Sequence, residues 1–169
     1  MEFLTGVKPQ TTLEISDLMK EEQIGNTVTV NGAVHALNCV GAVTFVILRK
    51  REGLLQCVYE EGKSGFDIRK LREGAAVEFA GILSRDERAP RGIEVRSREC
   101  RILAMPQAAM PLPISKWNMN TSLDARLNYR SLSLRNVRER AKFRLQEGIV
   151  RGFRDFLYSQ GFTEIHTPK

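Results

Sequence analysis

Cysteine and histidine are scarce in this chain of 169 residues. The three cysteines, Cys39, Cys57 and Cys100, are widely spaced and form no CxxC pair, which argues against a zinc cluster or a disulfide framework. The two histidines, His35 and His166, lie far apart in the sequence and away from any cluster of cysteines or carboxylates. We therefore predict no metal site and no catalytic residue in this chain.

Long apolar runs are also missing. The longest, residues 43–48, is interrupted by Thr44 and is far shorter than the roughly 20 residues that a membrane-spanning helix needs. An acidic residue, Glu2, follows Met1, where a secretory signal would begin with basic residues. We expect a protein of the cytoplasm with no membrane partner.

The composition is that of a folded domain, with 42% hydrophobic and 27% charged residues. The formal net charge of +6 is unevenly distributed. Residues 1–110 carry 15 basic and 15 acidic side chains, whereas residues 111–169 carry 11 and 5. The whole positive excess therefore lies in the last third of the chain.

Five segments before residue 105 have the alternation or the β-branched composition of strands. They are residues 27–36, 42–50, 54–60, 75–84 and 92–103. Between the third and the fourth, Ser64 is a suitable N-cap for a short helix that ends at Gly74. A further helix over residues 15–22, capped by Ser16 or Thr12, is predicted before the first strand.

The predicted order is three strands, a short helix and two strands. This is the element order of the OB-fold, a five-stranded barrel. We therefore predict a mainly β protein in which residues 1–104 form an OB-fold domain with an N-terminal helix. The exposed face of strands two and three binds oligonucleotides in this fold.

The composition and periodicity of the sequence change after this predicted domain. Three prolines between residues 105 and 113 disfavour helix and sheet, so we assign residues 105–122 to a linker. Residues 138–160 contain no proline and repeat apolar side chains at helical spacing, with Gly161 placed as a C-cap. Residues 123–169 are thus predicted to start a second domain with a long helix, which has no core of its own in this chain.

Phe45 and Gln56 are candidates for a base-reading pair. The predicted turn between strands two and three places Phe45 opposite residue 58, with Gln56 as a diagonal neighbour. An exposed ring stacks on a base, and an amide bonds to a base edge. The alternative is that Phe45 lies in the core and Gln56 is a solvated strand residue, and the pattern alone leaves both open.

Two groups of basic residues are less specific signals. The first flanks one mouth of the barrel, where it could contact phosphates or form ordinary solvated turns. It comprises Arg49, Lys50, Arg51, Arg85, Arg88 and Arg91. The second runs from Arg126 to Arg154 and could bind nucleic acid or pair with acidic groups of a partner or of further chain.

Residues 123–169 resemble the start of the catalytic domain of class II aminoacyl-tRNA synthetases. Their LxxRxxxRxLxLR pattern resembles that of the aspartyl, asparaginyl and lysyl subgroup, with matches at Arg126, Arg130, Leu132, Leu134 and Arg135. A later stretch looks like motif 1, which implies a homodimer interface. Its matching residues include Gly161, Phe162, Ile165 and Pro168.

The ending EIHTPK is most similar to aspartyl-tRNA synthetases of the archaeal and eukaryotic type. The resemblance implies an aspartate–tRNA ligase as the parent protein, an enzyme that uses ATP and Mg²⁺ to form aspartyl-adenylate and charge tRNA. Motifs 2 and 3, which hold ATP in this family, do not occur within the 169 residues. We expect these residues alone to bind tRNA, without a cofactor and without catalysis.

The predicted barrel resembles the anticodon-binding domain of the same family, which implies the anticodon loop of tRNA-Asp as the partner. In that family the ring matching Phe45 stacks on an anticodon base, the amide matching Gln56 bonds to a base edge, and the carboxylate matching Glu94 contacts the first anticodon base. Arg49 lies within the matching stretch. Asn38 stands where the family usually has an arginine that contacts the middle base, so we predict weaker or more permissive anticodon reading.

Two alternatives remain at this point. Asparaginyl-tRNA synthetases are near relatives of the aspartyl enzymes and fit many of the same residues. A general single-strand-binding OB module would fit the strand order, but it would have no reason to carry the LxxRxxxRxLxLR pattern.

Overall fold

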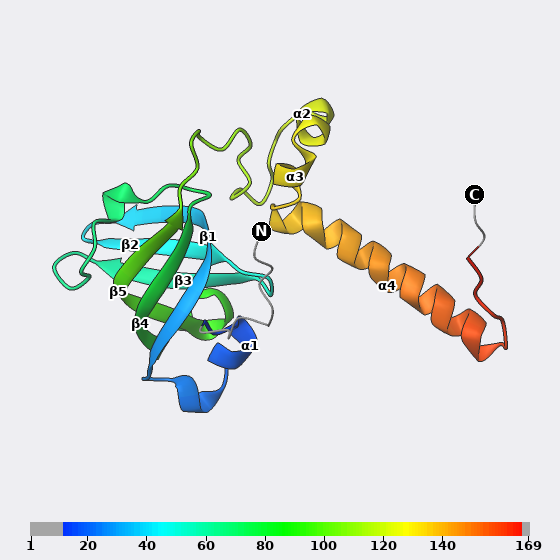
Figure 1. The fold of residues 1–169 in the computed structure, drawn as a ribbon, viewed down its shortest axis with the longest axis horizontal. Coiled ribbons are helices and arrows are strands. Elements are labelled where there is room, and N and C mark those ends of the chain that lie inside the picture. Colours follow the sequence, from blue (N-terminus) through cyan, green and yellow to red (C-terminus); the bar gives the residue numbers. More distant parts are fainter. Residues whose placement is uncertain (1–11, 167–169) are drawn as a thin grey trace, which may run out of the picture. The chain divides into compact units, whose positions relative to one another are not determined.

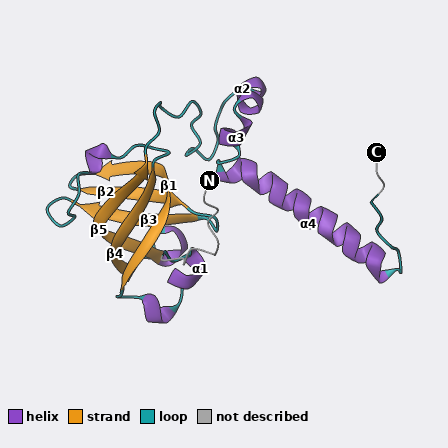
Figure 2. Ribbon diagram, viewed as in Figure 1, coloured by secondary structure: helices purple, strands orange, loops and turns teal. Residues whose placement is uncertain are grey.

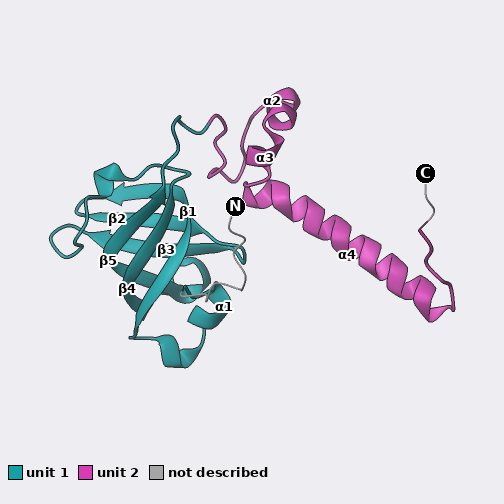
Figure 3. Cartoon of the chain, viewed as in Figure 1, with its two compact units in different colours: residues 1–110 teal, residues 111–169 magenta. Residues whose placement is uncertain are grey.

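The computed structural model describes residues 12–166, and the chain divides into two compact units after Met110 (Figure 3). The first unit contains all the strands that the described residues form (Figure 1). In chain order its elements are the helix α1 (Ile15–Leu18), the 3₁₀ turn η1 (Glu21–Gln23), the strands β1 (Thr27–Val40), β2 (Val43–Arg49) and β3 (Leu54–Glu60), the turn η2 (Ile68–Lys70), the strand β4 (Ala76–Arg85), the turn η3 (Pro90–Gly92) and the strand β5 (Ile93–Ala104).

The five strands close into a barrel in the order β1-β2-β3-β5-β4 (Figure 2). All neighbours are antiparallel except β3 and β5, which are parallel. This confirms the predicted mainly β, five-stranded OB fold. Strand β1 runs four residues beyond its predicted end, because only Gly41 and Ala42 separate it from β2 and pairing continues to Val40 opposite Val43.

The barrel core is built from the inward side of each strand. On β2 the side chains of Thr44, Val46 and Leu48 are buried, while the residues between them face outward and are half-buried. Phe79 on β4 is fully buried in the same core. Gly81 allows a close approach of β4 and β5, because a Cβ there would lie 2.2 Å from the carbonyl oxygen of Arg96.

The first predicted helix is shorter than expected. It ends at Leu18 instead of residue 22, and Glu14 is its N-cap, so the predicted caps Ser16 and Thr12 were wrong. The backbone N–H of Glu14 donates to Asp17 (3.4 Å), which closes the first turn. Ser16 instead donates its hydroxyl to Glu52 (3.1 Å), which ties this helix to the turn between β2 and β3.

The helix between β3 and β4 is reduced to the single 3₁₀ turn η2, which Asp67 caps by accepting from the backbone N–H of Arg69 (3.0 Å). Ser64 was predicted as the cap, but its hydroxyl donates to the carbonyl of Ser97 on β5 (2.6 Å). The serine therefore fastens the β3–β4 loop to the barrel and does not start a helix.

The second unit consists of irregular chain followed by α2 (Leu123–Asn128), α3 (Arg130–Ser133) and α4 (Val137–Ser159). Asn136 is the N-cap of α4: its Oδ1 accepts from the backbone N–H groups of Arg138 and Glu139. Its Nδ2 donates to the carbonyls of Ile114 (2.9 Å) and Lys116 (2.7 Å). These bonds hold part of the predicted linker against the start of α4, so that this part is packed and not extended.

The helix predicted over residues 138–160 is confirmed within one residue at each end. It ends in a Schellman motif, in which Phe162 N–H donates to the Leu157 carbonyl (3.1 Å) and Gly161 N–H donates to the Tyr158 carbonyl (3.0 Å). Gly161 has φ 81°, the left-handed conformation that glycine adopts without strain.

Candidate nucleic-acid interface

The strand register aligns the predicted base-reading residues in two rows across the outside of the barrel. In the first row, Asn38, Phe45, Val58 and Arg96 lie opposite one another on β1, β2, β3 and β5. In the second, Ile47, Gln56, Glu94 and Ser84 follow on β2, β3, β5 and β4. Residues separated by up to 58 positions in the sequence thus share one continuous surface.

Phe45 lies on the outer face of β2. Its neighbours Thr44 and Val46 are both buried, so the ring points away from the core and is half-buried. Its cross-strand partners are Val58, as the turn predicted, and Asn38, which is exposed. The alternative that Phe45 is a core residue is therefore wrong.

Gln56 and Glu94 are joined by a hydrogen bond from the amide Nε2 to the carboxylate (3.1 Å). They are cross-strand partners on the parallel pair β3 and β5. The carboxylate is only 3% exposed and also accepts from Ser84 Oγ and Arg96 Nε, both at 3.4 Å. Three donors thus orient a nearly buried anion beside an amide that retains a carbonyl oxygen and a second N–H.

Arg49 shares the outer face of β2 with Phe45, four residues further along the strand. It lies opposite Ala33 on β1 and Leu54 on β3, toward the end of the strand. Burial and then the Arg49 charge lower the pKa of His35, which occupies the β1 bulge. Arg49 is thus beside the two rows but does not belong to either.

The predicted basic mouth is only partly a cationic surface. Lys50 was wrong as a phosphate contact: it is buried, and its Nζ donates to the Asn31 carbonyl (2.8 Å). Arg91 donates to the Glu52 carbonyl (2.7 Å), which links the β4–β5 loop to the β2–β3 turn. Arg85 and Arg88 are paired with Glu21 and Asp86.

Sequence reasoning missed Arg96 and Ser84 as partners of Glu94. A signal was available for Arg96, because residues 94 and 96 on a strand face the same side. Ser84 could not be found in this way, since its position depends on how β4 pairs with β5.

The second unit presents an apolar helix surface. The side chains of Leu145, Ile149, Phe153 and Phe156 on α4 are each more than 60% exposed. Basic residues of this unit form ion pairs with carboxylates of the same unit, such as Arg126 with Glu139 (3.4 Å).

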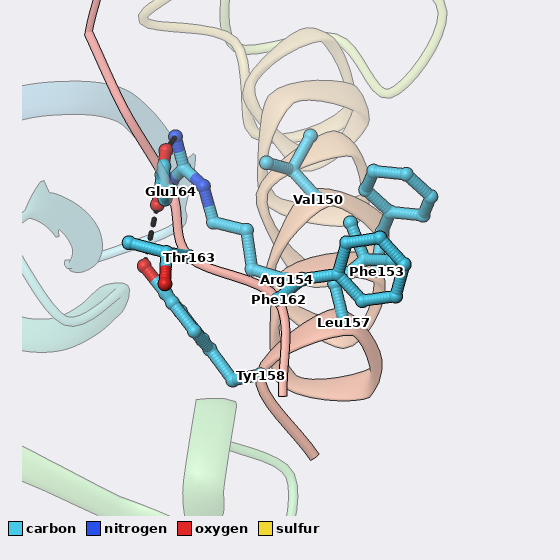
Figure 4. A pocket seen from close by; sticks show the side chains of 8 residues that line it. All are labelled: Val150, Phe153, Arg154, Leu157, Tyr158, Phe162, Thr163 and Glu164. Atoms are coloured by element: carbon cyan, nitrogen blue, oxygen red, sulfur yellow. Dashed lines mark hydrogen bonds and ion pairs between the residues drawn. The ribbon is translucent and has the colours of Figure 1, made fainter. Parts of the chain in front are cut away.

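A pocket at the end of α4 is shown in Figure 4. Glu164 folds back onto the helix, accepting from Tyr158 Oη (2.7 Å) and pairing with Arg154 (2.9 Å). Of the residues predicted for a dimer interface, Phe162 and Ile165 are 63% and 75% exposed. Gly161 is the helix cap, and Pro168 lies outside the described residues.

Two family models match the chain. Residues 28–103 match the OB-fold nucleic acid binding domain, and residues 122–169 match the class II tRNA synthetases (D, K and N). Together the two matches span most of the chain. The chain thus combines a match to the OB-fold nucleic acid binding domain with a match to part of the class II tRNA synthetases.

Similar proteins agree with this assignment. The aspartate–tRNA(Asp/Asn) ligase of Sulfurisphaera tokodaii is 37% identical over 92% of this chain and 36% of its own length. Among solved structures, the aspartyl-tRNA synthetase of Entamoeba histolytica (25% identity, TM-score 0.75) aligns with 98% of the chain and 40% of its own. The asparaginyl-tRNA synthetase of Pyrococcus horikoshii (27% identity, TM-score 0.76) aligns with 93% and 37%. The chain therefore spans little more than a third of the length of these relatives.

Between residues 12 and 166, no helix is long and apolar enough to cross a membrane. The same residues contain no group of three or more histidines, cysteines, aspartates or glutamates that could hold a metal ion.

Proposed function

We propose that the barrel binds the anticodon loop of tRNA-Asp as part of an aspartate–tRNA ligase. The observation that carries this proposal is the Gln56–Glu94 hydrogen bond in the row next to the outward-facing Phe45. The OB-fold match and the similarity to aspartate–tRNA(Asp/Asn) ligases support it.

Each group has a distinct role in this proposal. The Phe45 ring stacks on an unpaired base, and the Gln56 amide bonds to the edge of a base. The Glu94 carboxylate accepts from the first anticodon base while it keeps Gln56 oriented. Because the barrel unit carries no net charge over residues 1–110, stacking and hydrogen bonding must supply much of the selectivity.

The test is binding of the intact 169-residue chain to the tRNA-Asp anticodon stem-loop. We expect Phe45→Ala to weaken binding by about 5- to 150-fold, which corresponds to the roughly 1–3 kcal/mol of one stacked base. Tyr129→Ala, which removes an exposed ring of the second unit, is the matched control. Equal affinity for the stem-loop and for a hairpin with a scrambled loop would refute the proposal.

In our proposal, Asn38 limits how strictly the interface reads the middle anticodon base. It lies beside Phe45, but its amide is uncharged and shorter than a guanidinium, so we expect permissive reading of the middle anticodon base. Asn38→Arg should increase the penalty for substituting that base, whereas Asn38→Lys adds the same charge without the planar fork. If the natural chain already loses many-fold affinity for every single base substitution, this part of the proposal is wrong.

The parent enzyme in this proposal works in the cytoplasm as a homodimer and uses ATP and Mg²⁺. We expect no aspartate-dependent pyrophosphate exchange from the purified 169 residues. An asparaginyl enzyme is the second candidate, because its solved relative from Pyrococcus horikoshii has a similar fold.

A further inference from the structure

A groove lies on the barrel beside the base-reading rows. The side of it nearest the rows is formed by Val58 on β3 and Arg96 on β5. Its remaining walls include Lys63, Ser64, Ser97 and Arg98. Its volume of about 480 Å³ falls in the usual range of small-ligand sites.

The groove is continuous with the candidate interface. Arg96 lies in the same row as Phe45, with only Val58 between them. Because neighbouring strands are about 4.8 Å apart, the two backbones are separated by about 10 Å. A nucleotide whose base stacks on Phe45 would therefore have its sugar and phosphate within reach of a long cationic side chain from β5.

The charge of the groove suits an anion. Its lining contains three cations, at positions 63, 96 and 98. Lys63 pairs with Glu60 of the same lining, and Arg96 pairs with Glu94 (3.4 Å). Arg98 is exposed, and no carboxylate among residues 12–166 forms an ion pair with it. It occupies the β5 bulge, where Gly81 pairs with Ser97 and Ala80 pairs with Glu99.

The loop that closes the groove is fixed in place. Ser64 Oγ donates to the Ser97 carbonyl (2.6 Å), and Gly65 N–H donates to the Arg98 carbonyl (2.7 Å). Both bonds attach the β3–β4 loop to β5. The loop and strand positions that carry the cations are thus fixed on one surface before any ligand arrives, which lowers the entropic cost of ordering the loop on binding.

We propose that this groove binds the sugar–phosphate backbone of the RNA loop whose bases meet Phe45 and Gln56, with Arg96 and Arg98 contacting phosphates. The inference rests on the proposed function and extends it from base reading to backbone binding. Phosphate contacts fix the position of a nucleic acid without reading its sequence, so the groove would set the register in which the bases reach the two rows.

Arg98→Gln is the cleanest test, because Arg96 also bonds to Glu94. Affinity for the tRNA-Asp stem-loop is measured with the intact chain at salt concentrations from about 50 to about 200 mM, a fourfold range of concentration. We expect about tenfold weaker binding and a slope of log K against log salt that is shallower by about 0.7, the value for one lost contact to a single strand. The loss should be the same for every base-substituted loop.

Arg101→Gln is the matched control. This arginine lies on the same strand, is exposed and pairs with Glu78 (2.9 Å), outside the two rows and the groove. If Arg98→Gln changes the slope no more than Arg101→Gln, while Phe45→Ala still weakens binding, the groove inference is wrong and the proposed function stands. If the natural chain does not prefer the anticodon loop, the proposed function fails, and a shallower slope in Arg98→Gln would still support the phosphate contact.

Discussion

Glu94 is the residue on which the candidate interface depends most. A carboxylate that is 3% exposed must be compensated, and the donors are the side chains of Gln56 on β3, Ser84 on β4 and Arg96 on β5. The same bonds that compensate it also orient the Gln56 amide toward the outer face. Stability and recognition therefore share one hydrogen-bond network.

Replacing Glu94 by glutamine tests this coupling. The new amide N–H₂ would face the donors of Gln56 and Arg96, so we expect the free energy of unfolding to fall by about 1–3 kcal/mol and stem-loop binding to weaken. Urea denaturation measures the first effect. Glu99→Gln, on an exposed position of the same strand, should change neither quantity.

His35 makes the barrel sensitive to acid. It is 4% exposed, and burial followed by the charge of Arg49 lowers its pKa below the ordinary value of about 6.5. The unfolded chain therefore binds a proton more readily than the folded one. Stability is fully present above about pH 6.5 and falls as the pH decreases toward the lowered pKa.

This dependence can be measured by urea denaturation between about pH 5 and pH 8. We expect the natural chain to lose stability in acid and His35→Gln to lose less over the same interval. Parallel curves for the two proteins would contradict this assignment. The His35→Gln variant is compared only with itself across pH, so any loss from altered packing cancels.

The elements differ in how much they depend on tertiary contacts. Strand β1 is paired with β4 over its first half and with β2 over its second half, so its length follows from its two neighbours. Helix α4 instead carries its own signals: an Asn136 cap at the start and a Schellman motif at the end. Such local signals can be read directly from a sequence.

Two glycines, one within α4 and one directly after it, give a matched pair of substitutions that test this helix. Gly161→Ala places a Cβ on a residue at φ 81°, so we expect the last turn of α4 to lose about 1 kcal/mol. Gly152→Ala lies in the middle of the helix with open space around it and should gain about 0.5–1 kcal/mol. Amide hydrogen exchange at Phe162 should become faster in the first variant and not in the second.

At the scale of the whole molecule, the two units differ in how much of their apolar surface they bury. The barrel buries a core around residues such as Phe79 and Val95, whereas α4 leaves a row of large side chains in solvent. A contiguous apolar face of this kind indicates a protein interface. We infer that this face contributes to the homodimer of the proposed function.

We expect the 169-residue chain to associate with itself in a concentration-dependent manner through this face. Phe153→Asp places a charge at its centre and should shift sedimentation toward the monomer. Glu147→Ala, which removes an exposed carboxylate of the same helix, is the control. A natural chain that remains monomeric at every accessible concentration would contradict this expectation.

The sequence by itself determined the features that depend on local chemistry. Alternation placed the five strands, and the turn between β2 and β3 set Phe45 opposite Val58. Periodicity and a terminal glycine delimited α4. The class II pattern after residue 122 lies within one stretch of chain and needed no fold to be recognised.

Only the tertiary structure decided which distant residues meet. Gln56 and Glu94 are 38 residues apart, and their hydrogen bond exists because β3 and β5 pair in parallel at one register. Ser64 does not cap a helix for the same reason, because its hydroxyl donates to a carbonyl on β5. Barrel closure is a long-range pairing between strands, and no local pattern encodes the register at which two distant strands join.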